Sequence, residues 1–350
     1  MTVAFADSFD HYGTGSGAQS RLVEGEGAWT SIDGATINSS ISRTGARCLR
    51  LSSASHSIQK GFTLGLTIGL ACALYFDVLD QTTVNRPSIH FMSAGGSILF
   101  SMVFNPNGSV VVYGSSTSTT LGQSSGGLIT AGSWNHFEIK FSISTTVGSV
   151  EVRLNGVTII AVTDLNLGST AIGIVQYRCT YSSIGGSFQA WNIDDVVLWN
   201  NAGSVNNDFI GPARVYTQYP SADMSPMEWD VVGAASGAAA INNSTPDDDT
   251  SYVQADSEDL LAEFTIGTLP ADVERITSIH MVPRGRITDG GAGVILSYIK
   301  SDGEIAEGAN KSLSTSYAYR GEVFQVDPDG DIQWTKTKAQ NALFGLKRVS

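Results

Sequence analysis

The chain has 350 residues and a formal net charge of −13, and only 15% of its residues are charged, against roughly 25% in a typical soluble domain. Phosphate backbones repel an acidic chain, so the composition argues against a nucleic-acid-binding protein. Residues 204–350 carry 21 of the 33 acidic residues, and this asymmetry favours two domains with different surfaces. Abundant Gly, Ser and Thr with few charges predict an all-β chain of short strands and tight turns.

The N-terminal region shows no secretory signal and one long apolar segment. "MTVAFADSFDHY" has no basic segment before its apolar residues and reaches an acidic residue at Asp7, so we expect synthesis in the host cytoplasm without a signal peptide. "GTGSG" (Gly13–Gly17) is predicted to be a loop. Residues 61–76 are uncharged, but they fall short of the roughly 20 residues that span a bilayer and contain three glycines, so they predict two buried strands around a turn.

Two hairpins follow in the first half of the chain. Residues 98–114 predict one that turns at Asn107-Gly108. "SVEVRLNGVTII" (Ser149–Ile160) predicts another, with a type I′ turn at Asn155-Gly156, because both residues tolerate positive φ. In this second hairpin we expect the inward residues Val150, Val152 and Leu154 to be joined by the turn to Val157, Ile159 and Ala161.

The strand that precedes the second hairpin alternates strictly. In "HFEIKFSIS", the apolar residues Phe137, Ile139, Phe141 and Ile143 are predicted to face a core, and Glu138, Lys140 and Ser142 to face away from it. No window shows a sustained 3.6-residue period. The first half therefore predicts an antiparallel sandwich of two sheets.

The order of these segments resembles a known family. Trp134 opening a strand, the Asn155-Gly156 hairpin and the late strand "IDDVVLWN" (Ile193–Asn200) resemble the closing strands of a laminin-G or concanavalin A-like jelly roll. "DSFDHYG" and "RTGARCLRLSS" (Arg43–Ser53) stand where such domains begin. The whole order over residues 1–200 is similar to N-terminal domains of tailed-bacteriophage virion proteins.

Asp194 and Asp195 open the late strand and leave three roles to decide between. The resemblance places them at the start of the last strand, where Asp side chains accept hydrogen bonds from backbone N–H groups and fix a turn. Some laminin-G-like domains hold calcium near loop carboxylates, which is the second alternative. Catalysis is the third alternative, and the sequence offers no partner group for it. Glycoside hydrolysis would need two carboxylates about 5 to 9.5 Å apart.

A segment rich in Asn, Gly, Ser and Pro follows Trp199 and predicts a domain boundary near Gly203, with a sandwich over residues 1–202 and a smaller acidic β-rich domain over 203–350. "FIGPARVYTQYP" (Phe209–Pro220) mixes aromatic residues with this junction, so we expect a contact between subunits there. "NNDFIGPARVYTQYPSAD", "PDDDTSYV" and "QWTKTKAQNALFGLKRV" together resemble the C-terminal half of phage virion proteins.

The second half predicts short strands and one helix. Residues 274–287 alternate, with Ile276, Ile279 and Met281 as candidate core positions. Turns are predicted at Asp302-Gly303 and at Pro328-Asp329-Gly330, and a short helix near Thr335–Leu343 that ends in a Gly.

Three acidic motifs are candidates for metal binding. "PDDDTSY" (Pro246–Tyr252) and "DPDGD" (Asp327–Asp331) are predicted turns, with a calcium site as the alternative. "DPDGD" starts like an EF-hand loop, but Ile332 stands at its sixth position and Lys338 at its twelfth. The run from Asp247 to Glu263 has seven carboxylates and no basic residue, which predicts a solvated face or a surface that meets a basic patch at a subunit junction.

The histidines and cysteines of the sequence form no catalytic motif. The five histidines (His11, His56, His90, His136 and His280) form no HExxH pattern, and no Walker motif is present. Cys48, Cys72 and Cys179 form no CxxC pair and are predicted to be buried free thiols. We therefore assign no catalytic, cofactor-binding or metal-binding residue and expect no cofactor.

The resemblance implies a non-enzymatic structural protein of a tailed-phage virion, associated with the tail or its fibres and located in the virion. Its expected partners are other copies of itself, neighbouring virion proteins and host-surface glycans, through lectin-like binding, with no nucleic acid and no membrane insertion. Two alternatives remain open at this point. One is a capsid decoration or head-fibre protein, and the other is a glycan-degrading tailspike enzyme.

Overall fold

The computed structural model describes residues 2–79, 86–114, 119–180, 190–203, 205, 208–288, 291 and 293–350. The chain forms two compact units. Unit 1 comprises residues 1–10, 14–23 and 29–216, and unit 2 comprises residues 11–13, 24–28 and 217–350. The division falls after Tyr216 and not near Gly203, because backbone N–H groups of residues 210, 211 and 215 donate to side chains of unit 1. Whether each half is an independent domain stays a prediction.

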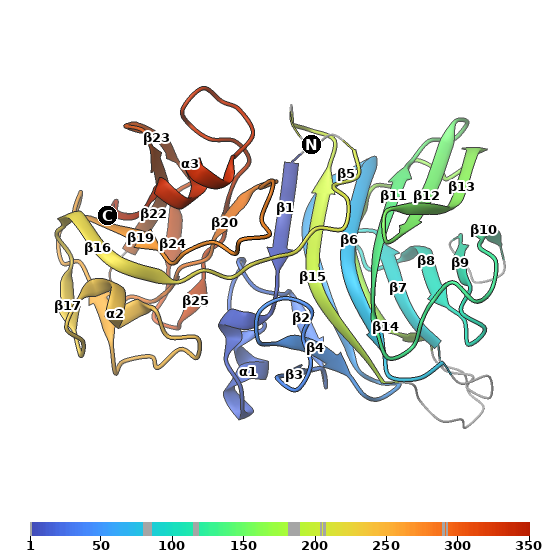
Figure 1. The fold of residues 1–350 in the computed structure, drawn as a ribbon, viewed down its shortest axis with the longest axis horizontal. Helices are drawn as coiled ribbons and strands as arrows, with labels where there is room; N and C mark the ends of the chain where they lie inside the picture. The colour runs from blue at the N-terminus through green and yellow to red at the C-terminus, as the bar shows by residue number, and fades with distance from the viewer. Residues whose placement is uncertain are drawn as a thin grey trace. The chain divides into compact units, whose positions relative to one another are not determined.

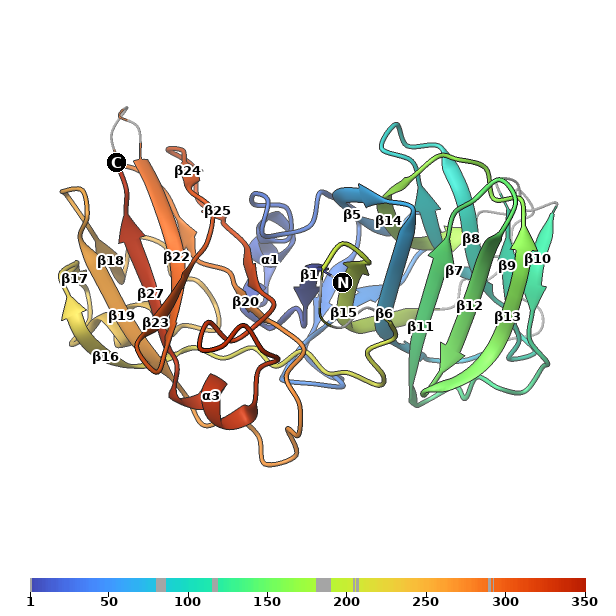
Figure 2. The same cartoon turned by 90° about the horizontal axis from the view of Figure 1, so that it is seen from above.

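Unit 1 is a two-sheet antiparallel jelly-roll sandwich, as the sequence predicted. In its first sheet the order of strands is β13 (Val157–Leu165), β12 (Gly148–Leu154), β11 (Trp134–Ser142), β6 (Thr67–Phe76), β15 (Trp191–Asn200), β4 (Cys48–Leu51) and β3 (Thr36–Asn38), with β1 (Thr2–Asp7) also paired to β15. In its second sheet the order is β10 (Thr120–Gln123), β9 (Val110–Tyr113), β8 (Ile98–Phe104), β7 (Arg86–Met92), β14 (Ile172–Thr180), β5 (Ser57–Gly65) and β2 (Ser31–Asp33). Figure 2 shows the two sheets facing each other, with β11, β12 and β13 on one side and β7, β8 and β9 on the other.

The core of unit 1 lies between the sheets and is rich in aromatic rings. Phe76 stacks on Trp191 with ring centroids 6.2 Å apart, and Phe141 of the first sheet stacks on Phe100 of the second at 4.6 Å. The residues predicted to face the core in and just after β11, Phe137, Ile139, Phe141 and Ile143, are all buried. Because such rings bury large apolar areas, this layer accounts for much of the stability of the sandwich.

Both predicted hairpins form, and the second differs in register. Asn155 and Gly156 have φ of 50° and 84°, as a type I′ turn requires. Beyond the turn a β-bulge shifts the pairing, so Val152 faces Ile160 and Val150 faces Val162. The turn joins Leu154 to Val157 as expected, but Val152 and Val150 do not meet Ile159 and Ala161. Ile160 is the buried residue of β13, and Val157 is 66% exposed.

Short helical turns precede β2. A 3₁₀ turn, η1, covers Asp10–Tyr12, and α1 covers Ser16–Arg21. The predicted loop at Gly13–Gly17 is thus helical over its last two residues. None of the helices in the described part of the chain is long and apolar enough to cross a membrane.

Unit 2 is built on a mixed set of small antiparallel sheets. Its main sheet runs β16 (Pro220–Met227), β19 (Leu261–Ile266), β27 (Leu343–Arg348), β22 (Gly293–Ser301) and β23 (Glu304–Glu307), with β24 (Lys311–Leu313) also paired to β22. Three two-stranded sheets accompany it: β17 (Asp230–Val232) with β18 (Tyr252–Gln254), β20 (Ile279–Met281) with β26 (Glu322–Phe324), and β21 (Arg284–Gly285) with β25 (Ala318–Tyr319). Figure 1 shows α2 (Gly237–Ile241) near β16 and β17, and α3 (Lys336–Asn341) near β22.

The core of unit 2 is smaller and includes positions that the sequence predicted. Ile276, Ile279 and Met281 pack against a buried cluster that contains Trp334 and Phe324. The predicted helix forms with Thr335 as its N-cap, but it ends at Asn341, and Gly345 lies inside β27. The helix ends early because Ala342 is already extended, which starts the next strand at once.

Candidate functional site

Asp194 and Asp195 lie inside β15 and not at its mouth. The first part of the strand, Trp191–Ile193, pairs with β4, and the later part, Val196–Asn200, pairs with β1. Between the two parts a β-bulge shifts the register, and Asp195 adopts the left-handed region with φ of 50°. An Asp tolerates this conformation better than most residues do, which explains its place at the bulge.

Both carboxylates are buried and fully engaged. Asp194 accepts hydrogen bonds from the backbone N–H of Arg43 at 2.8 Å, of Thr44 at 3.1 Å and of Asp195 at 2.8 Å. Asp195 accepts from Arg43 Nη1 at 2.5 Å, from the Thr44 hydroxyl at 3.0 Å and from the backbone N–H of Val215 at 2.7 Å. The pair therefore joins three stretches of chain that are far apart in sequence.

The electrostatics of the pair follow from burial. Loss of hydration raises the pKa of Asp194, and the adjacent charge of Asp195 raises it further. Burial also raises the pKa of Asp195, while the Arg43 guanidinium opposes this shift. Arg43 also donates to the Ala213 carbonyl oxygen at 2.6 Å, so its charge is held in place on both sides. Backbone and guanidinium donors occupy the carboxylate oxygens, and the two residues are 0% and 1% exposed, so the pair acts as a structural staple.

A third buried carboxylate holds the same segment of chain. Asp10 accepts from the backbone N–H groups of Ala46 and Arg47 at 2.8 and 3.0 Å, and burial raises the pKa of its carboxyl group. Gly45 has φ of 66°, and a Cβ there would lie 1.9 Å from an Asp10 oxygen, so only Gly fits this approach. "RTGAR" is therefore a loop that carboxylates fix, a role that the sequence reading did not assign to it.

Residues 208–216, which we call the strap, cover the outer face of the first sheet. Glu138 accepts from the backbone N–H of Ile210 at 2.9 Å and of Gly211 at 3.0 Å. Phe209 lies under the Arg153 guanidinium at 3.8 Å and the Lys140 ammonium at 4.7 Å. Glu138 was predicted to face away from the core, and it does so, but the strap buries it to 1% exposure.

The strap also bears on the predicted subunit contact at Phe209–Pro220. Its aromatic ring and the backbone N–H groups of Ile210, Gly211 and Val215 are engaged within unit 1. The first part of that segment thus packs on its own sheet, and the predicted contact between subunits stays a prediction. The strap follows β11 by about 70 residues, so the alternation of polar and apolar residues in β11 does not show that its outer face is covered.

In unit 2 the acidic turn Asp247–Asp249 meets two arginines. Arg284 donates to Asp248 at 2.6 Å and to Glu24 at 2.6 Å, and Arg286 donates to Asp249 at 2.8 Å. Asp248 and Asp249 are exposed, as expected of a solvated face, and each also pairs with an arginine. The basic partners lie in the same unit, on and just after β21, where residues two apart share one side of a strand.

An aromatic ring completes this group, which we call the Tyr317 patch: Tyr317, Arg284, Arg286, Asp248 and Asp249. The Tyr317 hydroxyl donates to Asp249 at 2.7 Å, and the Arg284 and Arg286 guanidiniums lie 4.2 and 5.2 Å from the ring centroid. The hydrogen bonds from Arg286 and Tyr317 lower the pKa of Asp249. The Asp249 side chain is 64% exposed and the Arg286 side chain 27%, so parts of this carboxylate acceptor and this guanidinium donor face the solvent while the ion pair holds them in place.

The loop that begins like an EF-hand is closed by its own lysine. Asp327 is buried and its carboxylate accepts from the backbone N–H of Asp329 at 3.1 Å, which forms a turn as predicted. Lys338, at the position of the twelfth ligand, forms ion pairs with Asp329 and Asp302. In the described ranges no three His, Cys, Asp or Glu side chains are grouped so that they could hold a metal ion.

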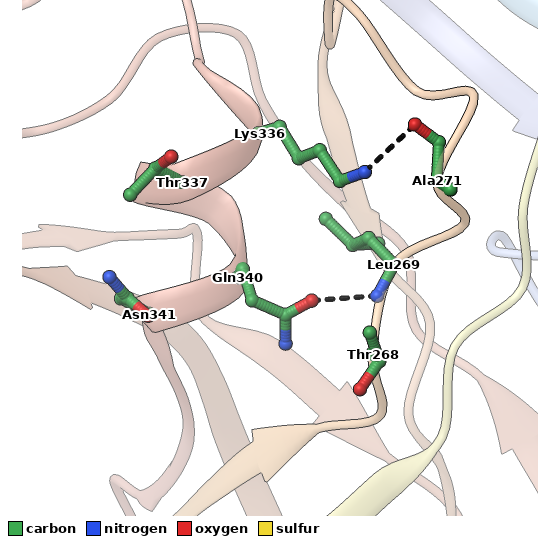
Figure 3. Close-up of a pocket in the computed structure, with 7 residues that line it drawn as sticks. All are labelled: Thr268, Leu269, Ala271, Lys336, Thr337, Gln340 and Asn341. Atoms are coloured by element: carbon green, nitrogen blue, oxygen red, sulfur yellow. Dashed lines mark hydrogen bonds between the residues drawn. The ribbon is translucent and has the colours of Figure 1, made fainter.

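A shallow groove of about 410 Å³ lies between residues 268–271 and α3 (Figure 3). Gln340 accepts from the backbone N–H of Leu269 at 2.6 Å, and Lys336 Nζ donates to the Pro270 carbonyl oxygen at 2.6 Å. These bonds tie the helix to the loop. The groove also offers the small polar groups of Thr268, Thr337 and Asn341, and no carboxylate lines it.

Two histidines and two cysteines are buried in unit 1. Burial lowers the pKa of His90 to about 4 and that of His136 to about 3, so both are neutral at pH 7. Burial raises the pKa of the Cys48 and Cys72 thiols, which are free and buried as predicted. The Cys179 side chain lies outside the described residues.

Comparison with known proteins gives only distant likenesses in structure. No family model and no curated protein matches the chain. Among solved structures, a sialidase matches with a TM-score of 0.39 and 11% identity. The match covers 58% of this chain and only 19% of the sialidase chain. The cellulose induced protein Cip1 matches with a TM-score of 0.42 and 13% identity, and the match covers 61% of this chain and 99% of that chain. The lectin UEA-II, solved with galactose, matches with a TM-score of 0.36 and 7% identity, and the match covers 56% of this chain and 98% of that chain. The sheet topology itself defines the fold of unit 1 as a jelly-roll sandwich.

Proposed function

We propose that this chain is a non-enzymatic structural component of a tailed-phage virion, associated with the tail or its fibres, that binds glycans on the host surface. Its place in the virion is supported by the resemblance of the two halves of the sequence to phage virion proteins. Other copies of the chain and neighbouring virion proteins are its proposed partners.

The observation that carries the non-enzymatic part of this proposal is the use of the carboxylates. Asp194 and Asp195 are the adjacent carboxylates considered above for catalysis, and both are buried and bonded to backbone N–H groups or to Arg43. A general acid or a nucleophile must reach the reacting atoms. Oxygens that hold the fold together in this way do not reach a polysaccharide.

The Tyr317 patch is the surface that suits a glycan best. A tyrosine ring gives a flat apolar face, and carboxylate and guanidinium groups beside it accept from and donate to hydroxyl groups. The ion pairs with Asp248 and Asp249 hold Arg284 and Arg286 in place, so little side-chain entropy is lost when a ligand binds. The patch carries two positive charges and, with Glu24, three negative ones, which favours a neutral sugar over an acidic one.

A binding experiment tests this proposal. The full chain is applied to an array of bacterial surface polysaccharides, and Tyr317→Ala is compared with Tyr113→Ala, a matched loss of a partly buried tyrosine in unit 1. We expect binding to neutral glycans that weakens roughly tenfold in Tyr317→Ala, because an aromatic contact contributes about 0.5–1.5 kcal/mol beyond its buried area. Absence of binding by the wild-type chain, or equal binding by both variants, contradicts the assignment of this patch.

A further inference from the structure

Five residues from the N-terminal part of the chain, Glu24–Ala28, belong to unit 2, although unit 1 precedes and follows them in sequence. They lie against β25, which pairs with β21 through Tyr319 and Arg284. The backbone N–H of Tyr319 donates to the Glu24 carbonyl oxygen at 2.6 Å, and the Gly27 N–H donates to the Tyr319 carbonyl oxygen at 3.1 Å. The segment therefore satisfies both backbone groups of a tyrosine that is only 2% exposed.

Two glycines allow the segment to come this close to β25. Gly25 has φ of 90°, and a Cβ there would lie 2.7 Å from the Tyr319 carbonyl oxygen. A Cβ at Gly27 would lie 2.8 Å from the backbone nitrogen of Gly321. Both of these nearest atoms belong to the backbone, which cannot rotate away as a side chain can. A larger residue at either position would therefore push the segment away from β25.

Glu24 connects the segment to the Tyr317 patch. Its carboxylate accepts a hydrogen bond from Arg284 Nε at 2.6 Å, and Arg284 Nη1 donates to Asp248, also at 2.6 Å. The Arg284 guanidinium, held between these two carboxylates, lies 4.2 Å from the centroid of the Tyr317 ring. Glu24 thus fixes a residue of the patch that is 260 residues away in sequence.

The two carboxylates that hold Arg284 differ in exposure. The Glu24 side chain is 23% exposed and the Asp248 side chain 50%, so water and salt screen the pair with Glu24 less. An arginine that is free to rotate loses conformational entropy when a ligand immobilises it, and one that is already fixed does not. Glu24 therefore lowers the entropic cost of binding a ligand at the patch.

We propose that the segment Glu24–Ala28 positions the Tyr317 patch: its contacts with β25 hold Glu24 in place, and Glu24 orients Arg284 toward a ligand. This inference rests on the proposed function, which assigns the patch to a glycan, and it adds a positioning residue from the N-terminal part of the chain. The patch is then formed only when this segment is seated on β25.

Substitution of Glu24 in the full chain tests this role without a ligand. The Arg284 Nε–H signal in an NMR spectrum of the isotope-labelled chain, assigned by its loss in Arg284→Lys, reports the hydrogen bond to Glu24. In Glu24→Gln the signal should shift and its exchange with water should speed up about tenfold, because a charge-assisted hydrogen bond is lost. Glu322→Gln is the matched control, since Glu322 is also 23% exposed and pairs with Lys311, outside the patch.

Glycan binding gives a second measurement. On the neutral polysaccharides that the wild type binds, Glu24→Gln should bind about three- to tenfold more weakly, because the ligand must now immobilise Arg284. Gly25→Ala, which displaces the segment but keeps Glu24, should change the Arg284 signal and the binding in the same direction. Gly303→Ala is its matched control, since Gly303 has φ of 97° and an added Cβ would meet nothing within 4 Å.

Far-UV circular dichroism and thermal melts establish that each variant is folded at the temperature of measurement. An Arg284 signal that Glu24→Gln leaves unchanged overturns the inference, whether or not the wild type binds a glycan. Unchanged glycan binding by Glu24→Gln, or an equal loss in Glu322→Gln, overturns it as well. A wild type that binds no glycan contradicts the proposed function, while a changed Arg284 signal would still support the orienting role of Glu24.

Discussion

Adjacent aspartates occur in two regions of this molecule and act differently in each. Asp194 and Asp195 are buried in β15, accept hydrogen bonds from the backbone N–H groups of Arg43, Thr44 and Val215, and join segments about 20 and 150 residues away. Asp248 and Asp249 are half exposed or more and pair with Arg284 and Arg286 at the surface. The same residue type thus fixes the fold in one place and orders a patch of surface in the other, because burial decides what each ion pair contributes.

The largest expected effect comes from a substitution in the buried region. Asp195→Asn keeps the size and tolerates φ of 50°, but it leaves the Arg43 guanidinium, 13% exposed, without its carboxylate. Removing one partner of a buried pair costs about 3–5 kcal/mol, so the free energy of unfolding of unit 1 should fall by that amount. Urea unfolding followed by tryptophan fluorescence measures the loss.

A second substitution sharpens this test. Arg43→Met added to Asp195→Asn removes the unpaired charge, and it should recover part of the lost stability, since the cost arises mainly from an uncompensated buried charge. If the double variant is less stable than Asp195→Asn by the full cost of losing Arg43, the two groups are not coupled. The structural role assigned to the pair would then be wrong.

A smaller effect comes from pH acting on the same buried region. His136 is buried beside this centre, and both its ring nitrogens lack a hydrogen-bond partner among the described residues. Burial, with a contribution from the Arg43 charge, lowers its pKa to about 3, against about 6.5 in the unfolded chain. The unfolded state therefore binds the proton more readily, and stability is lost as pH falls below about 6.5.

Between pH 6.5 and pH 5 this one group should cost about 2 kcal/mol of unfolding free energy. The measurement is the stability of wild type and of His136→Gln across that range. The variant should lack this part of the pH dependence. Equal slopes in the two proteins would mean that His136 titrates alike in the folded and unfolded states.

The smallest expected effect belongs to the exposed region. Asp249→Asn removes a surface carboxylate whose ion pair with Arg286 is screened by water, so the melting temperature should stay at the wild-type value. Differential scanning calorimetry of the variant checks this. A loss of the size expected for Asp195→Asn would remove the contrast between the two regions.

The sequence was a good guide to local structure, because local residues specify it. Asn155-Gly156 and Asp302-Gly303 predicted turns that the positive φ values confirm. The alternation around Phe141 predicted a core face that the burial confirms. The all-β sandwich followed from many such segments in order.

Long-range contacts were outside the reach of that reasoning. The strap buries Glu138, and Arg43 reaches Asp195 from 152 residues away, so neither role is visible in a local pattern. The β-bulge after Val152 changed which residues of β13 face inward, since one extra residue exchanges the two faces of a strand. The Arg284 and Arg286 partners of the acidic turn were likewise assigned only by the fold.

Hydrolysis of polysaccharide tests the central claim, that the buried carboxylates of unit 1 are structural, most directly. Purified full-length chain is incubated with bacterial surface polysaccharide, and newly formed reducing ends are measured for wild type, Asp194→Asn and Asp195→Asn at a temperature where all three are folded. We predict no release above the buffer control for any of them. Release by the wild type that disappears in either folded variant would contradict the claim and make Asp194 and Asp195 catalytic.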